Sequence, residues 1–159
     1  LWAAGVKPSP INQLLPAERD TAGRVVVQPD LRLSKAKNIF VLGDQAHVRG
    51  KDGQALPGLA PVAMQEGQHA ARNILAIVKG HETQPFKYVD KGVMATIGRK
   101  RAVARVGHFK FGGFFAWIAW LFVHVYYLIG FKNRLFVLYQ WFWSYVTYKK
   151  GARLIVSKD

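Results

Sequence analysis

The chain has 159 residues, half of them apolar, and carries 23 Lys and Arg against 9 Asp and Glu, a formal net charge of +14. This composition can bury a core, and the absence of cysteine excludes disulfides, zinc-thiolate centres, iron–sulfur clusters and thiol catalysis. The charge leaves three classes of partner: nucleic acid, an anionic membrane surface and an anionic small ligand. The first six residues, LWAAGV, are typical of a buried strand and do not begin with Met, so we expect a piece of a longer protein.

Two short strands and a helix are expected in the first half of the chain. Residues 24–27 (RVVV) and 39–42 (IFVL) are β-branched or apolar runs bounded by turn residues, which predicts strands. Residues 59–79 carry apolar side chains near helical spacing and precede Gly80, a helix stop signal. Pro61 suits the first turn of this predicted helix, where its missing N–H costs nothing.

An alternating stretch follows at residues 86–106. Its pattern predicts two or three antiparallel strands, with turns at 90–92 and 98–101. Together with the strands and the helix before it, this stretch predicts an α+β body.

The last third of the chain is apolar and aromatic. Residues 111–131 contain no charged side chain, and in a helix they would span about 30 Å, the thickness of a hydrocarbon core. Glycines at both ends and basic residues on both sides argue against a simple span, and the next apolar segment, 135–147, is too short to cross. A helical hairpin in the membrane interface explains both segments and is our prediction; a true span and a buried core helix are the alternatives.

Charge and aromatic residues are concentrated in the same part of the chain. Residues 91–158 hold 12 Lys or Arg and no Asp or Glu, whereas residues 1–90 hold 11 basic and 8 acidic side chains. Of the 21 aromatic residues, 17 lie between Phe109 and Tyr148. This mixture is typical of surfaces at the level of lipid headgroups, so we expect a membrane lipid surface and no nucleic acid as partner. Four tryptophans would either anchor the chain in that interface or pack helices together: Trp117, Trp120, Trp141 and Trp143.

The most informative chemistry lies in residues 39–67, where an apolar run ends in Gly43 and Asp44 and a loop leads to the start of the predicted helix. A carboxylate at the end of a buried strand can accept hydrogen bonds from sugar or polyol hydroxyls, and a preceding Gly lets the backbone approach a ligand. The free N–H groups of a helix start favour an electronegative atom. A plain Gly-Asp turn explains the pattern equally well, so the residues alone leave both interpretations open.

Longer motifs resemble one family. They are WAAGVKPSP at 2–10, DTAGRVVVQPDLRL at 20–33, NIFVLGDQA at 38–46, LPGLAPVAMQEGQHAARNI at 56–74 and PFKYVDKGVMATIGRKRAVA at 85–104. The sequence resembles, up to about Ile155, the C-terminal part of a type II, non-proton-pumping NADH:quinone oxidoreductase. These are FAD enzymes of the two-dinucleotide-binding-domain flavoprotein superfamily. The resemblance implies an α/β fold class, with an incomplete FAD-binding Rossmann-like domain and C-terminal amphipathic membrane helices.

The resemblance also implies a division of the chain. Residues 1–10 would end the NADH-binding domain, 11–107 would form the C-terminal part of the FAD-binding domain, and 108–159 would be a membrane-anchoring helical region. The phosphate-binding GxGxxG glycines, which in the family lie in two copies in the N-terminal part, are absent from the 159 residues. We therefore expect the isolated chain neither to bind FAD tightly nor to turn over.

Carried over by position, the resemblance implies a cofactor site. Asp44 would bind the ribityl or ribose region of FAD, with Gly43 allowing the approach. The backbone at Pro61, Val62 and Ala63 would hold the pyrimidine edge of the isoalloxazine, where the positive end of the helix dipole favours the anionic reduced flavin. The family commonly has Gln where this chain has Pro61, so no side-chain role is carried over there.

Two catalytic residues are implied in the same way. Gln65 would donate a hydrogen bond from its amide to a quinone carbonyl. Lys91 would stabilise flavin or quinol oxyanions, although its spacing alone favours a solvated turn lysine. No metal site is expected.

Other polar residues are expected to have no catalytic role. Glu66 is predicted to be a helix-surface acid, His47 and His69 to be solvated, and His124 to be a satisfied histidine on a helix face rather than a proton carrier. Four basic residues are predicted to contact solvent or lipid headgroups: Arg99, Lys100, Arg101 and Arg105.

The function implied by the resemblance is electron transfer from NADH through FAD to quinone, in the respiratory chain and without proton pumping. The protein would be peripheral on the cytoplasmic face of the inner cell membrane, and a homodimer is left open. One alternative is a non-catalytic, basic and aromatic membrane-association module. Another is a different quinone-reducing flavoprotein of the superfamily, such as a sulfide:quinone oxidoreductase, which is disfavoured because that chemistry uses cysteines.

Overall fold

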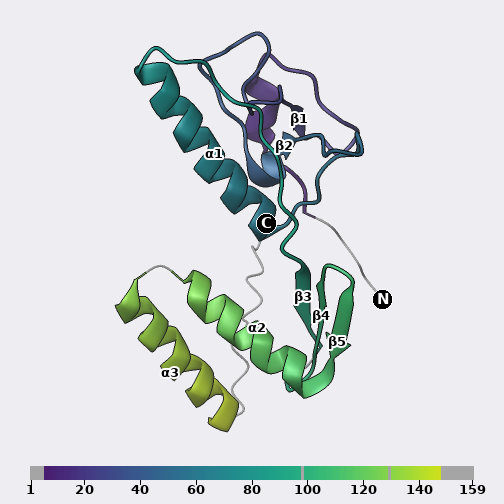
Figure 1. The fold of residues 1–159 in the computed structure, drawn as a ribbon, viewed down its shortest axis with the longest axis vertical. Helices are drawn as coiled ribbons and strands as arrows, with labels where there is room; N and C mark the ends of the chain where they lie inside the picture. Colours follow the sequence, from purple (N-terminus) through teal and green to yellow (C-terminus); the bar gives the residue numbers. More distant parts are fainter. Residues whose placement is uncertain (1–5, 98, 129, 148–159) are drawn as a thin grey trace, which may run out of the picture. The chain divides into compact units, whose positions relative to one another are not determined.

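The computed structural model describes residues 6–97, 99–128 and 130–147. The chain divides into two compact units, Leu1–Asp90 and Lys91–Asp159, and each is described by itself (Figure 1). The strand character expected for the first residues falls mostly on 1–5, outside the described residues. The domain boundaries expected after residues 10 and 107 stay predictions.

The first unit is built from short elements and one long helix. In chain order they are the 3₁₀ helix η1 (Pro10–Leu14), β1 (Val25–Val26), the 3₁₀ helix η2 (Gly43–Gln45), β2 (Ala46–His47) and α1 (Ala60–Val78). β1 and β2 pair in parallel, with Val25 opposite Ala46. Among the described residues, one cluster of seven buried apolar side chains forms the core of this unit: Val25, Leu31, Leu33, Val41, Ala46, Val48 and Ala70.

The sequence places two of these elements correctly. The strand expected at 24–27 is present but shorter, and the helix expected at 59–79 differs from α1 by one residue at each end, with Pro61 in its first turn. The helix is the better predicted of the two, because its periodicity extends over five turns and ends at a glycine.

The strand predicted at 39–42 is wrong. This segment makes one isolated bridge, between Arg32 and Phe40, and continues directly into η2. Two hydrogen bonds flank the bridge, from the Leu33 N–H to the Ile39 carbonyl at 3.0 Å and from the Val41 N–H to the Leu31 carbonyl at 3.1 Å. The pairing ends there, because Leu31 has a φ of 73° and donates its own N–H to the Gln28 carbonyl at 2.9 Å. The apolar run is explained by burial instead, since Val41 belongs to the core.

The second unit begins with a three-stranded antiparallel sheet in the order β3-β4-β5. Its strands are β3 (Val93–Thr96), β4 (Ala102–Val106) and β5 (Phe109–Gly112). Two of them fall in the stretch 86–106, as the alternation predicts, but the turn expected at 90–92 joins no strands. β5 was not predicted, because its aromatic residues merge with the apolar segment that follows it.

In the described part of the second unit, two helices follow the sheet: α2 (Gly113–Tyr127) and α3 (Phe131–Thr147). The rings of Trp120 and Trp141 stack at 5.5 Å, and those of Trp117 and Tyr145 lie 6.1 Å apart. Because the earlier residue on α2 contacts the later residue on α3, the two helices are antiparallel, as Figure 1 shows. A helical hairpin is therefore present, whereas its expected place in the membrane interface stays a prediction. The three tryptophans named above pack helices together.

Small side chains attach α2 to the sheet. Ala116 on α2 is fully buried against Ala102 and Ala104 of β4, with Met94 beside them. Alanines on both sides let the helix approach the strand closely. Among the described residues, we find no helix with the length and apolar character needed to cross a membrane.

Candidate functional site

The η2 turn and the start of α1 come together in the first unit. Gly43 has a φ of 61°, a conformation that favours glycine, and a Cβ placed there would lie 3.3 Å from the Cβ of Ala63. A Cβ on Gly58 would lie 2.9 Å from Asp44 Oδ1. Two glycines therefore let the helix start and the Asp44 carboxylate approach each other closely.

Asp44 presents a free carboxylate at this turn. Its side chain is exposed, and we find no hydrogen bond to its oxygens among the residues that the structure describes. A cavity of only about 10 Å³ lies beside it, and its lining includes Gly43, Val62 and Ala63. The residues predicted for a cofactor site thus share one small region, with Pro61 in the first turn of α1.

Two of the backbone donors at the helix start are already engaged. The N–H groups of Val62 and Ala63 both donate to the Leu59 carbonyl, at 3.0 and 3.1 Å. Pro61 has no N–H to offer. A ligand at this helix start would share these donors with Leu59, so the helix dipole and the shape of the site would contribute more than new hydrogen bonds.

Glu66 corrects the sequence analysis, which placed it on the helix surface. Its side chain is 1% exposed, and Oε2 accepts a hydrogen bond from the Gly43 N–H at 2.6 Å. Burial raises the pKa of the Glu66 carboxyl and outweighs the lowering by the Gly43 bond, and the Asp44 charge raises it further. The signal was present in the sequence: Glu66 lies four residues after Val62 and four before Ala70, on the buried face of α1.

The side chain of Gln65 pairs with the backbone of Val89 through two hydrogen bonds. Its Nε2 donates to the Val89 carbonyl at 3.0 Å, and its Oε1 accepts from the Val89 N–H at 3.1 Å. One amide hydrogen remains for another acceptor. Adjacent residues of α1 thus hold two backbone segments, at Gly43 and at Val89.

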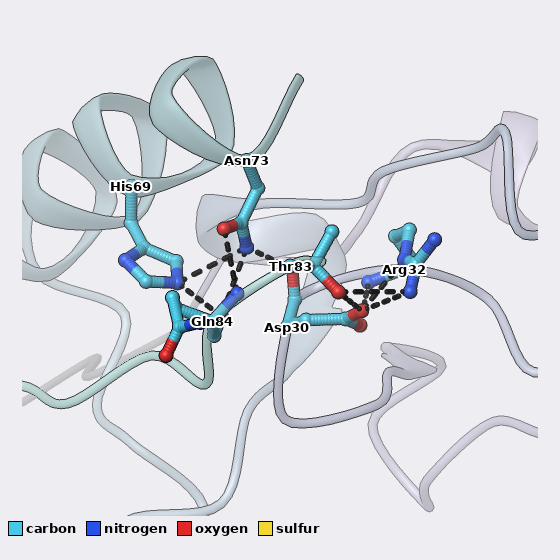
Figure 2. A network of polar contacts seen from close by, with 6 residues as sticks. All are labelled: Asp30, Arg32, His69, Asn73, Thr83 and Gln84. Carbon is cyan, nitrogen blue, oxygen red and sulfur yellow. Dashed lines mark hydrogen bonds and ion pairs between the residues drawn. The ribbon is translucent and has the colours of Figure 1, made fainter. Parts of the chain in front are cut away.

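His69 and Asn73 hold a third segment. His69 was predicted to be solvated, but its side chain is buried. Figure 2 shows both side chains reaching from α1 to the Gln84 backbone. The Gln84 carbonyl lies 2.7 Å from His69 Nε2 and accepts from Asn73 Nδ2 at 2.9 Å, and the Gln84 N–H donates to Asn73 Oδ1 at 2.9 Å. Thr83 continues the network by donating to Asp30 Oδ2 at 2.8 Å. Gln84 is therefore fixed to α1, and Thr83 to Asp30.

His47 is also not solvated. Its Nδ1 lies 2.9 Å from Asp20 Oδ2, which accepts from Arg24 Nε at 2.7 Å. Burial by itself raises the pKa of the Asp20 carboxyl, but the hydrogen bonds from His47 and Arg24 together hold it at about 2. This group ties β2 to the segment before β1.

The predicted residue Lys91 opens the second unit and is exposed. His124 fits its prediction as a satisfied histidine: its Nδ1 lies 2.8 Å from the Trp120 carbonyl, and the two rings are 4.0 Å apart. Arg99 donates to the Tyr145 carbonyl at 2.8 Å.

Large aromatic side chains are exposed on α2 and α3. Those more than half exposed are Phe114, Phe115, Phe122, Tyr126, Phe131, Phe136, Tyr139 and Phe142. An exposed apolar surface of this kind marks an interaction site.

Comparisons with known proteins agree on one family. Residues 91–148 match the model of the NDH2 C-terminal domain. The chain is 41% identical to the type II NADH:quinone oxidoreductase NdhA of Mycobacterium tuberculosis, over 99% of this chain and 34% of that protein. It is 40% identical to Ndh of the same organism, over 100% of this chain and 35% of that protein.

A solved structure agrees at the level of the fold. The structure of NDH2 from Plasmodium falciparum in complex with NADH matches 98% of this chain and 46% of that one, with a TM-score of 0.73 and 16% identity. The chain spans about a third of the length of the two curated relatives named above.

Proposed function

Because the chain is a C-terminal part of a type II NADH dehydrogenase, we propose that the protein containing it transfers electrons from NADH through FAD to a membrane quinone. The observation that carries the proposal is the arrangement at Asp44, an exposed carboxylate without a hydrogen-bond partner in the described chain, beside a glycine-lined helix start. The activity concerns the whole protein, since the chain spans about a third of its relatives.

The residues present fit FAD. The polyol and ribose hydroxyls of FAD are donors, and a free carboxylate accepts such bonds well. The cavity of about 10 Å³ is far too small for a ring system, so FAD would lie on the exposed side of Asp44. When bound, FAD supplies the redox chemistry: it accepts a hydride from NADH and passes two electrons on.

The remaining roles follow from position and chemistry. Gly43 and Asp44 would hold the ribityl or ribose part of FAD, and the start of α1 at Pro61, Val62 and Ala63 would favour negative charge on the flavin. The amide hydrogen of Gln65 that Val89 does not use donates to a quinone carbonyl. Lys91 supplies a cation for flavin or quinol oxyanions.

The second unit attaches the enzyme to the membrane that holds the quinone. Exposed aromatic side chains on both helices and the basic residues around them support this part of the proposal. Such surfaces bury their aromatic groups at the headgroup boundary while cations contact anionic lipids. The helices lie in the interface, on the cytoplasmic face of the inner membrane, as a peripheral anchor.

The test is quinone-dependent NADH oxidation by the purified full-length protein with FAD. The proposal predicts that NADH consumption requires both FAD and quinone and releases one quinol per NADH. Binding to anionic vesicles without any NADH oxidation would instead support the membrane-association module.

A further inference from the structure

We propose that Glu66 is a positioning residue for FAD, which fixes the Gly43–Asp44 turn so that the Asp44 carboxylate meets the cofactor. Glu66 itself does not touch FAD in this account, because its side chain is 1% exposed. The inference rests on the proposed FAD site. It gives a role to the buried carboxylate of Glu66, which does not bind FAD in that proposal.

The geometry supports a direct mechanical link. Oε2 of Glu66 accepts from the Gly43 N–H at 2.6 Å, a bond between residues 23 positions apart in the chain. Gly43 is the first residue of η2, and Leu42 before it makes no side-chain cap bond. Glu66 therefore satisfies an end donor of the short helix that carries Asp44.

Packing restricts the turn from the same side. The Gly43 backbone lies so close to α1 that a Cβ on it would be 3.3 Å from the Cβ of Ala63. Ala63 and Glu66 are one helical turn apart and face the same way. The hydrogen bond at Glu66 thus holds the turn against the helix, and the narrow space at Ala63 limits how the turn can move, so Asp44 has a fixed starting position.

A carboxylate at this buried position is costly unless it has a specific partner. Burial and the nearby Asp44 charge both raise the pKa of Glu66, while the Gly43 hydrogen bond lowers it. An apolar residue would avoid this cost but would leave the Gly43 N–H without its acceptor. The arrangement is therefore explained by a need for precise placement of the turn rather than by stability alone.

The test measures FAD affinity of the full-length protein by titrating the FAD-free form, with wild type, Glu66→Ala, Glu66→Gln, Asp44→Ala and the Glu66→Ala/Asp44→Ala double variant. We expect Glu66→Ala to weaken FAD binding about 10-fold. Glu66→Gln, whose carbonyl can still accept from Gly43, should stay within about 3-fold of wild type. In the Asp44→Ala background, Glu66→Ala should weaken FAD binding by less than about 2-fold, because Glu66 acts on FAD by positioning Asp44.

Asn73→Ala is the matched control. Asn73 is a buried polar residue on the same helix, but it bonds Gln84 and Asp30 rather than Gly43. Its loss should lower the unfolding temperature and leave FAD affinity within about 2-fold. If Glu66→Ala fails to fold, Glu66→Asp replaces it, because its shorter side chain withdraws the acceptor from Gly43.

Three results would overturn the inference: wild-type affinity in Glu66→Ala, an equal loss with and without Asp44, or an equal loss in Asn73→Ala. A full-length wild-type protein with no affinity for FAD would be a different failure. It would contradict the proposed function, and the role of Glu66 with it.

Discussion

The side-chain amide of Gln65 pairs with the backbone of Val89 through two hydrogen bonds, of 3.0 and 3.1 Å. The amide thus bonds the N–H and the carbonyl of Val89, as a neighbouring strand would do in a sheet. Val89 lies two residues before Lys91 in the sequence, so Gln65 fixes the chain just before that lysine. One residue further along α1, Glu66 holds the Gly43 turn through one hydrogen bond, from the Gly43 N–H to Oε2.

Replacing Gln65 tests its two hydrogen bonds to the Val89 backbone. Gln65→Ala removes both bonds and should lower the stability of the full-length protein by about 1 kcal/mol. Gln65→Glu should cost more, because a carboxylate oxygen would then face the Val89 carbonyl. Thermal unfolding of the two variants checks the order. A Gln65→Glu protein as stable as wild type would show that the paired geometry does not form.

Asp44 is the residue on which FAD binding depends most. Asp44→Ala should weaken FAD binding by about 10- to 100-fold, since it removes a charged acceptor. The matched control is Asp52→Ala, an exposed loop carboxylate that accepts from the Gln54 N–H at 3.1 Å. FAD titration monitored by flavin fluorescence measures both, and equal affinities in the two variants would remove Asp44 from the site.

The stability that Asp20 contributes depends on pH. Its hydrogen bonds with His47 and Arg24 hold its pKa at about 2, below the ordinary value of 3.8. A lowered pKa means that this stabilisation is complete above 3.8 and is lost as the pH falls through about 2. Asp20→Asn should therefore cost about 1–2 kcal/mol at pH 7 and almost nothing near pH 2.

Urea unfolding at a series of pH values measures that difference. The His47→Asn variant tests the partner, and its penalty should combine less than additively with that of Asp20→Asn. A penalty for Asp20→Asn that is the same at pH 7 and pH 2 would contradict the assignment.

A substitution at Gly92 tests how closely the backbone at the start of the second unit approaches Arg105. The φ of Gly92 is 99°, and a Cβ there would clash with the Arg105 carbonyl oxygen. Gly92→Ala should therefore cost about 3 kcal/mol or more. Gly107 is the control, since it has a φ of 57° and open space around it, and Gly107→Ala should cost about 1 kcal/mol. Thermal unfolding of both variants gives the comparison, and equal losses would mean that the close approach at Arg105 is absent.

Exposed aromatic side chains should determine membrane binding. Phe115 and Phe131 are 81% and 76% exposed, and burying each in the headgroup boundary is worth about 2 kcal/mol. Changing either to Ser should reduce co-sedimentation with anionic vesicles by at least about 10-fold in affinity. Leu14→Ser, at an equally exposed site in the first unit, should have no effect. Unchanged binding in both Phe variants would exclude these helices as the anchor.

The sequence was most informative where a periodic pattern or a long motif was present. Helix α1 was predicted to within one residue at each end, and the hairpin of α2 and α3 was predicted from two apolar segments. The apolar run at 39–42 was misleading, because Val41 is buried without belonging to a strand, and its pairing ends at Leu31, whose φ is positive. The local pattern of apolar residues does not show how far a segment pairs with the backbone elsewhere in the chain.

Polar residues were harder to predict than apolar ones. Glu66, His69 and His47 were expected at the surface because each is ionisable, but their partners are backbone groups or side chains distant in the sequence. For Glu66, the helical spacing from Val62 to Ala70 was a usable signal. For His47, nothing in the local sequence indicates that Asp20 lies 2.9 Å away.

The most direct test follows the flavin in the full-length protein without oxygen. NADH is added first and a short-chain quinone second, while the visible absorption of oxidised flavin is recorded. The proposed function predicts that, in the wild-type protein, the absorption disappears with NADH and returns in full with quinone. The Asp44→Ala protein, which binds FAD more weakly, should show less of this flavin signal. Flavin that is reduced by NADH but not reoxidised by quinone, or a protein that holds no flavin, would contradict it.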